Sequence, residues 1–265
     1  AAHPLLGAVG VDRTFYAPVG VDTLAAYAAA VPATFRFLVK AHEALTLARF
    51  PAHARYGALR GQASPQYLDP AYATDAVIAP FVDGLGPRGG VLLFQFAPLA
   101  AELLAGPGGK SAPRRFAERL YRFLRELPRG PRYAVEVRTA ELLTPDYAAA
   151  LRAVDAVPGL ALLPGLPPLD VQAKLTRAHE AAALVIRWML AAHHDYESAL
   201  AAYQPFDRLV DPDPRSRRAI VDLLRGALAR GVPATVIVNN KAEGSSPRSI
   251  VELARELVDG DPVPF

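Results

Sequence analysis

Short apolar segments typical of buried strands alternate with longer segments of helical periodicity along the whole chain. This alternation indicates repeated βα units, which build a parallel sheet covered by helices. The predicted strands are Ala8–Tyr16, Phe35–Ala41, Gly90–Ala97, Arg132–Arg138, Leu160–Leu163, Ala183–Met189 and Ala234–Asn240. A chain of 265 residues has the length of one α/β barrel. We therefore predict a parallel TIM-type (β/α)8 barrel, formed as a single domain over residues 1–265.

A closed barrel of this type has eight strands, whereas seven are visible here, so we expect the first strand to be missing from this chain. Two connections are longer than usual for such folds, His42–Leu68 and Leu190–Pro212. Each follows the carboxyl end of a predicted strand, where barrels bind their ligands. Both are therefore candidate lids.

The helices are marked by apolar stripes and by their first residues. The clearest stripe lies in Pro113–Leu127, where Phe116, Leu120, Phe123, Leu124 and Leu127 repeat at helical spacing. Four predicted helices begin with a capping side chain followed by proline, at Asp69-Pro70, Thr144-Pro145, Asp213-Pro214 and Ser246-Pro247. Hydrophobic residues make up 52% of the chain and aromatic ones 8%, so we expect a core built mainly from Ala, Val and Leu. Such a core favours helices packed on a parallel sheet.

Several functional classes are excluded by composition. The chain has no cysteine, so it can form no disulfide, thiolate nucleophile or cysteine-based zinc site. The longest apolar stretch, Ala181–Ala192, is interrupted by Arg187 and is too short to span a bilayer. We expect a cytoplasmic protein without a membrane segment. The net charge of +3 is too small to indicate a nucleic-acid partner by itself.

Polar residues gather in the carboxyl halves of the predicted strands. Because residues two apart share a face of a strand, Glu136 and Arg138 lie together and are expected to point into the barrel. The chain has four lysines, and two of them, Lys40 and Lys241, stand at strand ends. The predicted catalytic residues are Glu136 and Lys40, and the predicted ligand-binding residues are Tyr16, His42, Gln95, Arg138, Arg187, Asn239, Asn240 and Lys241. Two plainer explanations stay open: solvated strand ends, and an ion pair between Glu136 and Arg138 that joins two strands.

An ordered series of segments resembles the domain-of-unknown-function-72 family, also called YecE-like, over nearly the whole chain. The matching segments are 12–16, 35–41, 93–98, 134–138, 185–187 and 238–240. The family's first strand, a Gly-Thr-Ser-Gly-Trp-like segment, is not found. Residues 239–244 read Asn-Asn-Lys-Ala-Glu-Gly, where many relatives have an acidic residue directly after the paired asparagines. The resemblance implies a barrel fold and no settled activity.

Three functions are compatible with these residues. The leading hypothesis is a protein, with enzymatic activity left open, that binds a small anionic or carbohydrate-like molecule. In it Arg138, Arg187, Lys40 and Lys241 hold negative charge and Glu136 acts as acid or base. A nucleic-acid-binding or nuclease-like barrel could use Tyr56 and Tyr67 for base stacking. The third alternative is a non-catalytic protein that binds a metabolite or a partner protein. The oligomeric state stays open.

No cofactor and no metal are predicted. His193 and Glu197 stand one helical turn apart, but the sequence shows no third or fourth ligand near them. Gly106–Ser111 ends like a phosphate-binding loop, yet Leu104 occupies the position of the motif's first glycine, so we interpret the segment as a flexible loop.

Overall fold

The computed structural model describes residues 3–98 and 112–259, which form two compact units. The first unit comprises Leu6–Ala156, and the second begins at Val157 and includes His3–Leu5. The predicted loop Gly106–Ser111 lies outside the described residues. The expectation of a single domain over residues 1–265 stays a prediction.

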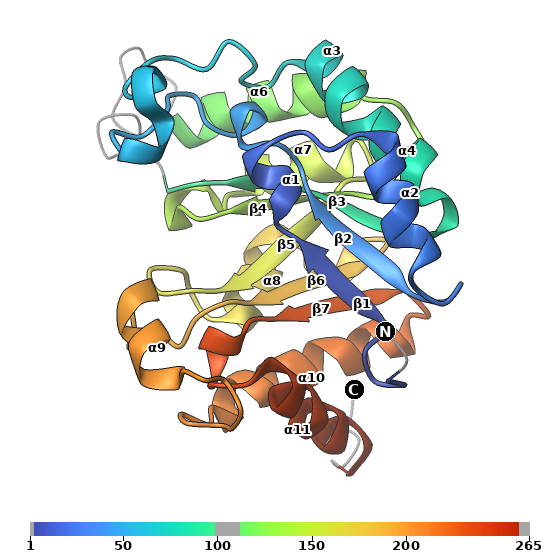
Figure 1. Cartoon of the computed structure of the whole chain (residues 1–265), viewed down its shortest axis with the longest axis vertical. Coiled ribbons are helices and arrows are strands. Elements are labelled where there is room, and N and C mark those ends of the chain that lie inside the picture. Colours follow the sequence, from blue (N-terminus) through green and yellow to red (C-terminus); the bar gives the residue numbers. More distant parts are fainter. Residues whose placement is uncertain (1–2, 99–111, 260–265) are drawn as a thin grey trace. The chain divides into compact units, whose positions relative to one another are not determined.

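Among its described residues, the first unit contains four parallel strands with helices between them (Figure 1). Its strands are β1 (Ala8–Val11), β2 (Arg36–Lys40), β3 (Gly89–Phe96) and β4 (Tyr133–Val137). Its helices are α1 (Arg13–Tyr16), α2 (Val21–Ala29), α3 (Pro70–Ala73), α4 (Ala79–Leu85), α6 (Ala112–Glu126) and α7 (Pro145–Arg152). Each strand pairs with the one before it in the sequence.

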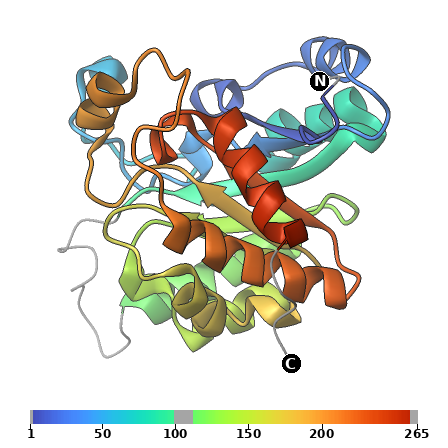
Figure 2. The same cartoon turned by 90° about the horizontal axis from the view of Figure 1, so that it is seen from below.

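The second unit repeats this arrangement. Its strands are β5 (Val157–Leu162), β6 (Leu184–Trp188) and β7 (Ala234–Val238), again parallel and in sequence order. Its helices are α8 (Leu169–Thr176), α9 (Tyr196–Tyr203), α10 (Pro214–Ala229) and α11 (Ser246–Asp259). Helix α11 lies alongside α10 (Figure 2). The predicted fold class, a TIM-type α/β barrel with seven visible parallel strands, is confirmed.

Each unit has its own apolar core. In the first, the predicted stripe of α6 is confirmed, because Phe116 and Phe123 stand edge-on to Phe96 and Phe94 of β3. In the second, Trp188 at the end of β6 is buried among aliphatic side chains of α8, α10 and α11. No helix in the described parts of the chain combines the length and apolarity needed to cross a membrane.

Three of the four predicted helix starts are confirmed by hydrogen bonds. The side chains of Asp69, Thr144 and Asp213 each accept a hydrogen bond from a backbone N–H in the first turn of α3, α7 and α10. The fourth helix, α11, begins one residue earlier than predicted, at Ser246. The Ser246 N–H donates to Asn240 Oδ1 over 2.8 Å. A side chain six positions earlier therefore caps this helix.

Three predicted strand boundaries are wrong. The first strand stops at Val11, and Arg13–Tyr16 form α1, so the predicted site residue Tyr16 lies on a helix and not on a strand. The last strand stops at Val238, because the chain turns into a short 3-10 helix at Asn240–Ala242. The fifth strand begins at Val157 and not at Leu160. The alternation of strand side chains therefore does not apply to Tyr16, Asn239 or Asn240, which lie beyond the ends of their strands.

Helices α2 and α4 pack so closely that position 84 has no room for a side chain. A Cβ atom on Gly84 would lie 2.6 Å from the Leu24 Cβ and 2.8 Å from the Val21 carbonyl oxygen. We expect Gly84→Ala to lower the free energy of unfolding by about 1–3 kcal/mol through overpacking, measured by urea denaturation. The control is Gly226→Ala in α10, where an added Cβ meets no atom within 4 Å. This substitution should stabilise the helix by up to about 1 kcal/mol, and equal effects of the two would contradict the close contact.

Candidate functional site

Three predicted residues meet at the carboxyl ends of β3 and β4. Gln95 and Glu136 are register partners on these neighbouring strands, and Arg138 stands two residues after Glu136. Arg138 Nε donates to Glu136 Oε1 over 2.8 Å, and Arg138 Nη2 donates to Gln95 Oε1 over 2.9 Å. The Glu136 side chain is fully buried, whereas that of Arg138 is 25% exposed. The buried carboxylate thus orients a guanidinium that solvent can reach.

Lys40 ends β2 beside a different carboxylate. Its ammonium lies 3.4 Å from Asp12 Oδ1 and 3.9 Å from the centre of the Phe15 ring. Thr14 Oγ1 donates to the Lys40 carbonyl oxygen over 2.7 Å and so ties α1 to the end of β2. The Lys40 side chain is almost completely buried, but that of Asp12 is half-exposed. This group presents a carboxylate to solvent with a cation behind it.

The connection after β2 contains a buried carboxylate that the sequence analysis missed. Glu43 accepts a hydrogen bond from the Tyr56 hydroxyl over 3.0 Å and forms an ion pair with Arg55. Burial is the main cause that raises the pKa of Tyr56. The neighbouring residue, His42, contacts the Tyr72 hydroxyl over 2.7 Å, and burial lowers the pKa of its ring. Glu43 is the one acidic residue in the long connection His42–Leu68, and this was the sequence feature that could have identified it.

The tyrosines proposed for base stacking are occupied by other contacts. Tyr67 is partly buried against the apolar core, with the guanidinium of Arg119 4.9 Å from its ring centre. Tyr56 is held by Glu43 and Arg55. These contacts do not favour the nucleic-acid alternative. Tyr16 is exposed on α1, and the Arg55 guanidinium lies 5.0 Å from its ring centre.

The predicted residues of the second unit serve mainly local structure. Asn239 Oδ1 accepts from the Lys241 N–H over 3.0 Å, and Asn240 caps α11. The Lys241 ammonium lies 4.3 Å from the centre of the Tyr196 ring. Arg187 is buried in the middle of this unit's sheet, between register partners on β5 and β7. The paired asparagines therefore have a capping role that accounts for their position without a ligand.

A cavity of about 390 Å³ lies beyond the carboxyl ends of β5 and β6. Its wall is mostly apolar and includes Leu162, Leu166, Pro168, Trp188 and Leu190. Asp213, the N-cap of α10, also lines it. None of the predicted site residues lines this cavity. An apolar cavity of this size fits a small ligand or one end of a larger one.

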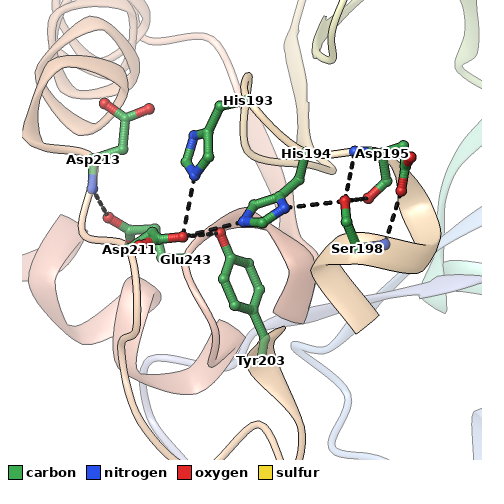
Figure 3. Close-up of polar contacts among 8 residues, drawn as sticks. All are labelled: His193, His194, Asp195, Ser198, Tyr203, Asp211, Asp213 and Glu243. Atoms are coloured by element: carbon green, nitrogen blue, oxygen red, sulfur yellow. Dashed lines mark hydrogen bonds and ion pairs between the residues drawn. The ribbon is translucent and has the colours of Figure 1, made fainter. Parts of the chain in front are cut away.

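The structure brings His193 and His194 together with Asp211, all within the second unit (Figure 3). The sequence pattern had placed Glu197, one helical turn away, near His193 and gave no third ligand, so no metal site was predicted there. The Tyr203 hydroxyl donates to Asp211 Oδ2 over 2.7 Å and is the main cause that lowers the pKa of that carboxyl. Asp211 lies in a loop, 18 positions from His193, so no periodic pattern could have identified it.

Comparisons with known proteins identify related chains. A sequence model of the family described as "Protein of unknown function DUF72" matches residues 2–263. A DUF72 family protein from Enterococcus faecalis V583 has a TM-score of 0.56 at 15% identity, over 98% of this chain and 89% of that one. A DUF72 family protein from Thermotoga maritima MSB8 has a TM-score of 0.54 at 17% identity, over 94% of this chain and 83% of that one. A search of curated proteins finds no match. At these identities the structural likeness shows the fold alone.

Proposed function

The chain belongs to the DUF72 family of proteins of unknown function, and we propose that in this chain the carboxyl ends of β2–β4 bind a small anionic or carbohydrate-like ligand. The family supplies the fold and names no activity. The proposal therefore rests on the side chains at these strand ends, and above all on the held, partly exposed guanidinium of Arg138.

Arg138 has donors to spare for a ligand. A guanidinium carries five N–H donors in a planar fork. Within the described chain, its side-chain hydrogen bonds go to Glu136 and Gln95. Because both partners are buried, the guanidinium plane is held in one orientation and loses little entropy when it binds an anion. A carboxylate or phosphate group is the ligand chemistry that such a fork recognises best.

The group at the end of β2 supports a ligand that also carries hydroxyls. The half-exposed carboxylate of Asp12 can accept hydrogen bonds from such hydroxyls, and the Lys40 ammonium lies 3.4 Å behind it. The first unit thus offers an exposed carboxylate at Asp12 in addition to the guanidinium of Arg138. An anionic sugar or hydroxy acid carries both hydroxyls and a carboxylate, so it matches these two groups better than a simple anion does.

Glu136 supports binding more directly than catalysis. Its carboxylate is fully buried and accepts a hydrogen bond from Arg138. A general acid or base must come within about 3 Å of a reacting proton. We therefore assign Glu136 the role of orienting Arg138. Catalysis by Glu136 or Lys40 stays a prediction from the sequence.

Titration calorimetry with inorganic phosphate and D-glucuronate tests the proposed site. We expect Arg138→Met to weaken the binding of D-glucuronate about 10- to 100-fold, because a hydrogen bond to a charged group contributes about 1.5–3 kcal/mol. Glu136→Gln should weaken binding less, since the guanidinium remains but is held less firmly.

The matched control is Arg114→Met on α6. Arg114 also pairs with a glutamate, Glu118 at 3.4 Å, but this pair lies on the exposed surface of a helix. Its loss should leave the affinity unchanged. Equal binding by the wild type and Arg138→Met, or no heat from either probe, would remove this site from consideration.

A further inference from the structure

A cluster of two histidines and one aspartate lies in the connection between β6 and α10. Nε2 of His193 and Nε2 of His194 lie 3.2 and 3.3 Å from the same oxygen, Oδ2 of Asp211 (Figure 3). One ligand atom from each residue can be chosen so that all three lie within 4.8 Å of one another. The described parts of the chain contain no second group of this kind. The cluster belongs entirely to the second unit and is independent of the ligand site proposed above.

Backbone hydrogen bonds place the three side chains. The chain turns at Ala191–His194, where the His194 N–H donates to the Ala191 carbonyl, and this turn brings the ring centres of the two histidines within 4.4 Å. The loop after β7 forms backbone hydrogen bonds with both ends of the connection between β6 and α10. The Ala191 N–H donates to the Lys241 carbonyl over 3.0 Å, and the Asp211 N–H donates to the Glu243 carbonyl over 3.3 Å. The cluster therefore lies on loop segments that backbone hydrogen bonds fix to the loop after β7.

A neighbouring serine orients the ring of His194. The Ser198 hydroxyl lies 3.1 Å from His194 Nδ1, accepts the Asp195 N–H over 3.0 Å and can donate to the Asp195 carbonyl over 3.3 Å. With its proton on that carbonyl, the hydroxyl accepts from Nδ1–H. In that tautomer Nε2 of His194 presents its lone pair to Asp211. Two lone pairs at this distance repel each other unless a proton or a cation lies between them.

The carboxylate of Asp211 also has a hydrogen-bonding neighbour that orients it. The Tyr203 hydroxyl donates to Asp211 Oδ2, and its ring stands edge-on to the ring of His194. Histidine ligands of metal ions usually donate their other ring N–H to a neighbouring acceptor, and ligating carboxylates are themselves hydrogen-bonded. Ser198 and Tyr203 supply both features here.

We propose that His193, His194 and Asp211 form a site for a zinc-type divalent cation, with Nε2, Nε2 and Oδ2 as ligands. Zinc binds imidazole nitrogen and carboxylate oxygen at about 2.0–2.2 Å, so adjacent ligands of a tetrahedral ion lie about 3.3–3.5 Å apart. The two nitrogen–oxygen distances of 3.2 and 3.3 Å are close to this ligand–ligand distance. The His193 side chain is 63% exposed, so an ion can enter from solvent. Three protein ligands leave a fourth position for water or a substrate.

Calorimetric titration of the untagged, chelator-treated full chain with ZnCl2 tests the site. We expect one Zn²⁺ per chain, and Co²⁺ in its place should give the visible absorption bands of four-coordinate cobalt. His194→Ala and Asp211→Asn should each abolish the cobalt bands. Asparagine keeps an acceptor for the Tyr203 hydroxyl, so the second variant preserves the local fold. If either variant still unfolds, His193→Ala replaces it, because that side chain is the most exposed of the three.

The matched control is His179→Ala. His179 Nε2 lies 3.5 Å from Glu180 Oε1, so it forms an imidazole–carboxylate contact like those of the cluster, but belongs to no group of three ligands in the described chain. Its loss should leave zinc binding unchanged. Ser198→Ala should weaken zinc binding about 10- to 100-fold while the cobalt band shape is kept, because it removes a hydrogen bond to a ligand and not the ligand itself.

Two results would overturn the site. The first is zinc binding by His194→Ala and Asp211→Asn with the affinity of the wild type. The second is no zinc binding by the wild type, in which case the three side chains contact one another through hydrogen bonds alone. Neither result bears on phosphate or D-glucuronate binding at Arg138, so this proposal and the proposed function fail separately.

Discussion

Arg217→Met is expected to lower the free energy of unfolding by about 3–5 kcal/mol, because it leaves a buried carboxylate without its cation. Arg217 on α10 is buried, and its Nη1 lies 3.1 Å from Oε1 of the fully buried Glu243. The same Glu243 oxygen accepts the Asp213 N–H over 2.6 Å, and the other has no hydrogen-bond partner among the described residues. Circular dichroism during urea denaturation measures the effect.

A second substitution separates this charge effect from lost packing. Arg217→Met combined with Glu243→Gln removes both buried charges and leaves only the partly exposed Glu256, 2.9 Å from Arg217 Nε, without its cation. The double variant should therefore be more stable than Arg217→Met alone. The matched control is Arg255→Met, whose partner Glu252 lies 2.6 Å away in an exposed pair on α11. An exposed pair of this kind contributes about 1 kcal/mol or less. A similarly small effect of Arg217→Met would show that Glu243 does not depend on its cation.

Trp188→Ala is expected to cost about 3–5 kcal/mol of unfolding free energy, the range for removing a buried aromatic side chain. Trp188 is 1% exposed, packs in the core of the second unit and forms part of the wall of the 390 Å³ cavity. The space it leaves would be added to that cavity. Trp188 is the one tryptophan of the chain, so unfolding must be followed by circular dichroism and not by tryptophan fluorescence.

Two further variants test whether the effect of Trp188→Ala comes from the loss of buried apolar contacts. Trp188→Phe keeps most of the apolar contact and should cost less than the alanine variant. Val258→Ala on α11 removes an apolar side chain that is 81% exposed, and should change stability by no more than about 0.5 kcal/mol. If Trp188→Ala were no worse than Val258→Ala, the tertiary packing around β6 would differ from that described.

Much of the fold could be predicted because its determinants are local. The helical spacing of Phe116 and Phe123 predicted the buried face of α6, and Asp69 and Thr144 marked helix starts through hydrogen bonds within one turn. The same local reasoning failed at Tyr16, because alternation cannot show where a strand gives way to a helix.

The candidate site was predictable only where strand geometry applies. Glu136 and Arg138 are two residues apart in β4 and directly beyond it, so their placement on one face followed from the alternation of side chains. Asn239 and Asn240 lie beyond the end of β7, and the structure uses them as caps instead. The pair of Glu136 and Arg138 was thus within reach of the sequence, whereas the contact of Arg138 with Gln95 and the capping roles of the asparagines were not.

The sequence by itself determined the order of strands and helices, the apolar faces and the polar strand ends, because each depends on spacing along a few turns or residues. Tertiary structure alone decided which of these groups meet. Gln95 reaches Arg138 across 43 positions, and Asp211 reaches His193 across 18, through a loop without periodicity. Such contacts depend on how strands pair and how loops turn back. A hydrogen bond or a metal site requires atoms a few ångströms apart in space, and the separation of two residues along the chain does not specify the distance between their atoms.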